Sequence, residues 1–216
     1  MFKNKKTTLI LVVIVIVVIA VGAWLITKNK DDKATETPGG ATASGKGEAK
    51  SLSQTFYIYD TVVNIKVFGE NVAQKNMDDI QQMLERMDME LSRTKEGGEV
   101  YAVNQAAGKE AVVVSDETLD VVKQSVQYAK EMDGLFDPTI GPLIDLWNIG
   151  SGGDKVPDPA AIDAAKSLTN YRDVEIDEAA KTVKLLKENM VLDLGGIGKG
   201  YAADRIADYL KEQGLN

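Results

Sequence analysis

A glycine-rich turn near the C-terminal end of the chain constrains its fold more than any other feature. The apolar run at residues 191–194 leads into four glycines around Lys199. Apolar residues then recur at helical spacing, at Ala203, Ile206, Ala207 and Leu210. Glycines let backbone N–H groups approach a phosphate, a helix N-terminus favours negative charge, and a lysine adds a point charge. The pattern predicts an anion-binding strand-to-helix turn, although such turns are more often purely structural, and neither the P-loop nor the dinucleotide-binding glycine spacing fits.

The composition excludes several kinds of active site. The 216 residues contain no histidine and no cysteine. Serine–histidine and cysteine–histidine catalysis, ordinary zinc sites and disulfides are therefore impossible. The remaining routes to strong chemistry are a hard cation held by oxygen ligands or a borrowed cofactor.

The charge of the chain argues against nucleic acid as a partner. The formal net charge is −8, with 25 basic and 33 acidic residues. Within the first 26 residues every charge is positive, at Lys3, Lys5 and Lys6, so the rest of the chain is more acidic still. A surface of this sign repels a phosphate backbone.

The N-terminal part of the chain has the pattern of a membrane anchor. Residues 9–26 form an uncharged run of 18 residues behind the three lysines, which suits a bilayer-spanning helix. Basic residues ahead of the run place the N-terminus in the cytoplasm. We therefore expect residues 1–30 to form an anchor in the cell membrane, with one pass and an extracytoplasmic domain. A cleaved signal peptide with a cleavage site at residues 20–23 is the alternative.

The remaining chain divides into a tether and one domain. Residues 31–53 are poor in large apolar side chains and predict a flexible linker. Residues 54–216 predict a single α+β domain with mixed α/β layers. The expected strands are residues 56–68, 111–114, 174–176 and 182–186. The expected helices are residues 72–91, residues 116–133, a short turn near Trp147, residues 160–168 and the helix after the glycine turn. Ser115 is expected to cap the helix over residues 116–133, and Gly134 is expected to end it. The expected buried stripe of the first helix is Ile80, Leu84, Met87 and Leu91.

Two long motifs connect the chain to a known family. Residues 133–147 read DGLFDPTIGPLIDLW, and residues 192–204 read LDLGGIGKGYAAD. Their order and separation strongly resemble the ApbE family of FAD:protein FMN transferases. Residues 60–65 resemble the opening strand of the family, and Ser92 and Asn104 resemble the stretch beyond its first helix. The resemblance covers residues 57–216 and implies the family's fold.

The resemblance also implies an activity, which is Mg²⁺-dependent transfer of FMN from FAD to a threonine hydroxyl of a partner flavoprotein, with release of AMP. It assigns FAD contacts to Asp193 and Lys199, and a backbone carbonyl ligand for Mg²⁺ to Gly196. The resemblance also implies a flavin contact for Tyr59, where the family often packs a methionine on the flavin. It places Leu135, Phe136 and Asp137 at the flavin site, with Thr139 shaping that loop. Asp204 would order the glycine turn. A non-catalytic, membrane-tethered flavin- or nucleotide-binding module is the alternative.

The chain departs from the family pattern at several positions. Asp60 stands where the family usually has glycine, Thr94 where an aromatic residue often contacts the flavin, and Gly97 and Gly98 where a serine and a glutamate are common. By family length the chain resembles the N-terminal two thirds of such an enzyme. The Asp and Thr that complete the Mg²⁺ site are expected in the part that is missing, so this chain alone is expected to transfer no FMN.

The expected topology makes a prediction for intact cells. Protease added outside should cleave within residues 31–53 and release a soluble domain, because an exposed linker of small polar residues is an accessible cleavage site. Immunoblotting of the medium and of the membrane fraction measures the release. Full protection of the domain in intact cells, together with cleavage after lysis, would contradict this topology.

Overall fold

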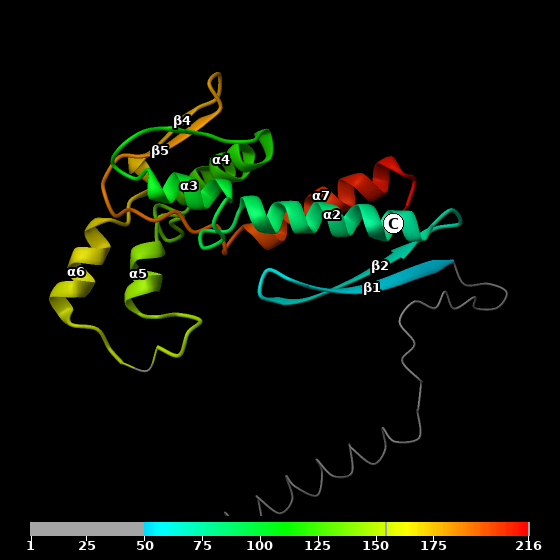
Figure 1. Ribbon diagram of the computed structural model, residues 1–216, viewed down its shortest axis with the longest axis horizontal. Helices are drawn as coiled ribbons and strands as arrows, with labels where there is room; N and C mark the ends of the chain where they lie inside the picture. Colours follow the sequence, from blue (N-terminus) through cyan, green and yellow to red (C-terminus); the bar gives the residue numbers. More distant parts are fainter. Residues whose placement is uncertain (1–49, 154, 216) are drawn as a thin grey trace, which may run out of the picture. The chain divides into compact units, whose positions relative to one another are not determined.

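A computed structural model describes residues 50–153 and 155–215 (Figure 1). The expected membrane anchor and most of the expected linker lie outside these residues. Within the described part, no helix is both long and apolar enough to cross a bilayer.

The domain opens with a β-hairpin rather than with one strand. Strand β1 (Ser51–Ile58) pairs antiparallel with β2 (Thr61–Phe68), and Ile58 faces Thr61 across the turn. The prediction of a single strand over residues 56–68 was therefore wrong. The two turn residues, Tyr59 and Asp60, both have left-handed backbone with φ of 55° and 54°. Two-residue hairpin turns of this kind favour Asn-Gly or Asp-Gly, so nothing in Tyr-Asp marks the reversal in the sequence.

One helix covers the hairpin, and a second helix packs on the first. Helix α2 (Gln74–Glu90) packs against β1 and against helix α7 (Gly198–Glu212), as Figure 1 shows. The apolar stripe predicted for the first helix is confirmed, since its four residues are all buried. The stripe predicted for the last helix is only partly right. Ala203 is exposed, while Tyr201 and Ala202 are buried with Ile206 and Leu210.

A second group of elements builds a three-stranded sheet with the order β3–β5–β4. The strands are β3 (Val112–Val113), β4 (Val174–Asp177) and β5 (Thr182–Leu185), and all pairs are antiparallel. Helix α4 (Asp116–Glu131) contacts β4 and begins at Ser115, whose hydroxyl accepts the Thr118 N–H as predicted. The helix closes where the Gly134 N–H donates to the Ala129 carbonyl at 2.8 Å.

Short helices complete the fold. Helix α5 (Gly141–Leu146) packs against α6 (Pro159–Ser167), and a 3₁₀ turn (Tyr171–Asp173) leads into β4. Helix α3 (Glu99–Gln105) contacts β5 and was missed in the sequence, because only Val100 and Val103 mark its buried side. The α+β class predicted from the sequence is confirmed. One core joins both sheets, with side chains from Phe56 and Val67 in the hairpin to Val183 and Leu185 in β5.

The first motif packs against the residue just before the second motif, and this contact leaves no room for a side chain at Gly141. A Cβ atom at this position would lie 2.4 Å from Val191 Cγ1 and 2.7 Å from the Val191 carbonyl oxygen. We predict that Gly141→Ala lowers the free energy of unfolding by about 1–3 kcal/mol, because the backbone must move apart to admit the methyl group.

The matched control is Gly200→Ala in the first turn of α7, where a Cβ would meet no atom within 4 Å. This substitution should be neutral or stabilise by up to about 1 kcal/mol, because alanine favours the helix. Urea unfolding of both variants measures the difference, and equal stability of the two would contradict the prediction.

Candidate functional site

The candidate site is built on an extended segment, residues 190–194, just before the glycine turn. The side chains of Met190, Leu192 and Leu194 are buried in the core. Because successive side chains of extended backbone point to opposite sides, Asp193 faces away from the core. The segment is not the strand that the sequence predicted: only Val191 forms a bridge, in parallel with Ile140.

Partners from distant parts of the chain satisfy the backbone of this segment. The side-chain amide of Asn104 accepts the Leu192 N–H at 2.7 Å and donates to the Leu192 carbonyl at 3.0 Å. The Asp193 N–H donates to the Pro138 carbonyl at 2.7 Å, and the Gly141 N–H donates to the Val191 carbonyl at 3.2 Å. The two motifs therefore lie side by side, in direct backbone contact.

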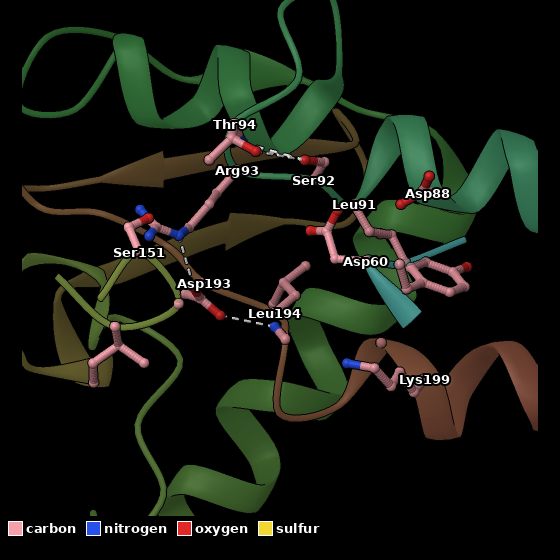
Figure 2. A pocket seen from close by; sticks show the side chains of 15 residues that line it. Asp60, Asp88, Leu91, Ser92, Arg93, Thr94, Ser151, Asp193, Leu194 and Lys199 are labelled. Carbon is pink, nitrogen blue, oxygen red and sulfur yellow. Dashed lines mark hydrogen bonds and ion pairs between the residues drawn. The ribbon is translucent and has the colours of Figure 1, made fainter. Parts of the chain in front are cut away.

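The Asp193 carboxylate is held from two sides. Its Oδ1 accepts the Gly195 N–H at 2.8 Å, and its Oδ2 lies 2.8 Å from Arg93 Nε. Another guanidinium nitrogen of Arg93, Nη1, lies 2.8 Å from Asp145 Oδ1 on α5. Figure 2 shows Arg93 reaching toward Asp193, which in turn reaches the backbone of the glycine turn.

The glycine turn leads directly into helix α7, whose first residues are Gly198, Lys199 and Gly200. The Ile197 and Gly198 N–H groups donate back to the Leu194 carbonyl. Among the described residues, no acceptor bonds the N–H groups of Lys199 and Gly200. Free N–H groups at a helix N-terminus favour an anion, and this is the geometry that the sequence pattern predicted.

A cavity of about 360 Å³ opens beside this turn. It brings together Tyr59, Asp193 and Lys199, three of the residues that the sequence singled out. In Figure 2 the Arg93 guanidinium and the Lys199 ammonium lie on either side of the segment that carries Asp193 and Leu194. The other lining residues are Asp60, Asp88, Leu91, Ser92, Arg93, Thr94, Ile149, Gly150, Ser151, Leu194, Gly195 and Gly198.

Tyr59 enters this cavity from the tip of the hairpin. Its hydroxyl is enclosed and has no hydrogen-bond partner among the described residues. Burial raises the pKa of Tyr59 above its ordinary value, and the nearby carboxylates of Asp88 and Glu117 raise it further. The phenol therefore stays protonated at physiological pH and remains a donor.

The loop of the first motif is built around Asp137 and Thr139. Asp137 Oδ1 accepts the Thr139 N–H at 2.8 Å and the Thr139 hydroxyl at 2.6 Å, and Asp137 Oδ2 accepts the Tyr171 N–H at 2.9 Å. The Thr139 oxygen also accepts the Asn170 N–H at 2.8 Å. Thr139 is fully buried. The hydrogen bonds to the Asn170 and Tyr171 N–H groups fix the loop to the start of the 3₁₀ turn.

The remaining predicted site residues lie outside this cavity. Leu135 is 94% exposed, and Asp137 is engaged in the loop. Phe136 packs on the glycine turn, since a Cβ at Gly196 would lie 3.1 Å from its ring. Asp204 is exposed on α7, and within residues 50–153 and 155–215 no hydrogen bond joins it to the turn.

The comparison with protein families decides what this chain is. The ApbE family model matches residues 59–216, which include the cavity and both motifs. This protein belongs to the ApbE family. The resemblance seen in the sequence is thereby confirmed, and so is the fold that it implied.

Named relatives of this ApbE chain are FAD:protein FMN transferases. The protein of Klebsiella pneumoniae (strain 342) is 39% identical over 132 residues, which cover 61% of this chain and 42% of the relative. The protein of Treponema pallidum (strain Nichols) is 28% identical over 186 residues, covering 82% of this chain and 51% of the relative. The chain thus spans about half the length of the curated relatives it matches, less than the two thirds expected from the sequence.

Solved structures agree on the fold. The flavin transferase ApbE from Vibrio cholerae superposes with a TM-score of 0.72 at 28% identity, covering 78% of this chain and 55% of that structure. The ApbE protein of Thermotoga maritima gives 0.68 at 30% identity, covering 73% of this chain and 52% of that structure.

Sequence reasoning missed the roles of Arg93 and Asp145 in this ApbE chain. Arg93 belongs to neither motif, and Asp145 lies within the first motif without any sign of a role. Arg93 and Asp193 are 100 positions apart, so no local spacing relates them. Only the fold brings the guanidinium between the two carboxylates.

The buried hydroxyl of Thr139 yields a prediction on stability. Thr139→Val should lower the free energy of unfolding by about 3 kcal/mol, because the Asn170 N–H loses its acceptor and Asp137 loses a donor. Thr139→Ser keeps the hydroxyl and loses one buried methyl group, at a cost of about 1 kcal/mol. Urea unfolding measures both variants. The bonding scheme is refuted if the valine variant proves as stable as the serine variant.

Proposed function

We propose that the protein transfers FMN from FAD to a threonine hydroxyl of a partner flavoprotein and releases AMP, with Mg²⁺ as the required metal. The cavity beside the glycine turn carries the proposal, because it places Asp193 and Lys199 next to the free N–H groups at the start of α7. Membership of the ApbE family, whose named relatives are FAD:protein FMN transferases, supports the same activity.

The site suits the diphosphate of FAD. The free N–H groups of Lys199 and Gly200 supply donors at the positive end of a helix, and the Lys199 ammonium adds a full charge. Charge develops on phosphate oxygens when the phosphoanhydride bond of FAD is exchanged for a phosphoester to threonine, and fixed donors stabilise that charge without reorganisation. In this reaction the oxygen–phosphorus bond to the threonine forms, the bond to AMP breaks, and the threonine proton is lost.

The metal requirement rests on the family resemblance. Within the part of the chain that the structure describes, no group of three or more Asp and Glu side chains could hold a metal ion. The carbonyl of Gly196 alone does not fit the six oxygen ligands of Mg²⁺. Phosphate oxygens of the substrate and residues beyond those described would have to complete such a site.

The same proposal includes a place in the cell. Basic residues ahead of the apolar run at residues 9–26 support an anchor in the membrane with the catalytic domain outside the cytoplasm. An acceptor flavoprotein exposed on that side of the membrane is the partner that fits this arrangement.

Substitution of Lys199 tests the site directly. We predict that Lys199→Ala weakens FAD binding by roughly 1–3 kcal/mol, the value of a charge-assisted contact. The matched control is Lys211→Ala at the far end of the same helix, where the lysine pairs with Asp208 and lies away from the cavity. Calorimetric titration of the intact protein with FAD measures both variants. An unchanged affinity in Lys199→Ala would leave Lys199 as a solvated surface residue.

An activity assay separates transfer from binding alone. A form of the protein as long as its curated relatives is incubated with FAD, Mg²⁺ and an acceptor that carries a threonine, and flavin fluorescence is followed on the acceptor band while released AMP is quantified. We expect labelling and AMP in equal amounts, both lost when a chelator removes Mg²⁺. FAD binding without AMP release would support the non-catalytic binding module instead.

A further inference from the structure

Arg93 holds a position that no local pattern explains. It follows α2 by three residues, and its side chain is only 21% exposed. Its guanidinium lies between the carboxylates of Asp193 and Asp145, at 2.8 Å from each. One residue thus joins the exit of α2, helix α5 and the segment that leads into the glycine turn.

The position of Arg93 affects the net charge of the cavity. Three carboxylates line the cavity, at Asp60, Asp88 and Asp193. Asp88 pairs with Lys95, so that its charge is balanced outside the site. Asp193 lies two residues before Gly195 and beside the helix end that is open to an anion. Without a cation next to it, the Asp193 carboxylate would repel a diphosphate bound there.

We propose that Arg93 is a positioning residue for dinucleotide binding, acting through Asp193. The ion pair offsets part of the Asp193 negative charge and holds its other oxygen on the Gly195 N–H. The glycine turn is thereby fixed with the N–H groups of Lys199 and Gly200 open toward the ligand. This inference rests on the proposed function, because the ligand is the FAD of that reaction.

Asp145 explains why the residue is arginine. A guanidinium presents donors in a rigid fork, so it pairs with Asp145 and Asp193 at once. A lysine ammonium is a single point charge on a flexible stem. It can neutralise Asp193 but does not keep the same orientation while also reaching α5.

The first test compares FAD affinities of the intact protein. We expect Arg93→Gln to weaken binding about tenfold, because a charge-assisted pair is lost, and Arg93→Lys to restore it to within about threefold. In an Asp193→Asn background, Arg93→Gln should change the affinity less than about twofold, because its effect passes through Asp193. Lys123→Gln, which breaks the ion pair to Glu178 outside the cavity, is the control and should bind FAD like the wild type.

A second readout needs no ligand. In the protein without FAD, Arg93→Gln should speed hydrogen exchange at the Gly195 amide, whose acceptor is Asp193, whereas Lys123→Gln should not. Unchanged exchange at Gly195 would overturn the positioning role. So would an equal loss of affinity in the Asp193→Asn background, which would indicate that Arg93 contacts the ligand itself.

The outcomes separate this inference from the proposed function. If the wild-type protein does not bind FAD, the proposed function fails, while the exchange at Gly195 still tests the link from Arg93 to the turn. If the wild type binds FAD and Arg93→Gln binds it equally well, the positioning role fails and the proposed function stands.

Discussion

The site depends on how the backbone of residues 191–194 is satisfied outside a sheet. The segment runs between a buried core and a cavity, where an unpaired N–H or carbonyl group would be costly. Its partners are the Asn104 side chain, the Pro138 carbonyl and the Gly141 N–H, each from a different element. This pairing orients Asp193 toward the cavity and leads the chain into the glycine turn. Helix α7 begins directly after that turn.

Hydrogen bonds and a close glycine contact hold the first motif in place. Asp137 and Thr139 tie the first motif to residues 170 and 171, and Gly141 brings it against Val191 without a side chain between them. A chain without histidine or cysteine has no metal-ligand cluster of those types and no disulfide to do this work. Hydrogen bonds to carboxylates and close glycine contacts hold these segments instead. The fixed direction of such hydrogen bonds gives the site a defined geometry.

The backbone at the tip of the hairpin, which lines the same cavity, is strained. Tyr59 and Asp60 both adopt left-handed backbone, which side chains other than glycine and asparagine rarely do, and both reach the cavity. Such conformations cost of order 1 kcal/mol or more each and persist where the surroundings hold them. The Tyr59 phenol is enclosed between the hairpin and the body of the domain, so its packing offsets part of that strain.

The sequence by itself determined the family, the α+β class, most helix positions and the glycine turn that opens the last helix, because these depend on local spacing and on two long motifs. It could not reveal the reversal at Tyr59 and Asp60, since the usual turn residues are absent, nor α3, whose buried side has only two apolar residues. The burial of Tyr201 and Ala202 in place of Ala203 depended on how α7 rotates against α2. The link from Arg93 to Asp193 and Asp145, and the pairing of Asn104 with Leu192, join residues up to 100 positions apart. Only the tertiary structure decided these contacts, because a side chain has no local preference for a partner that folding brings to it from a distant element.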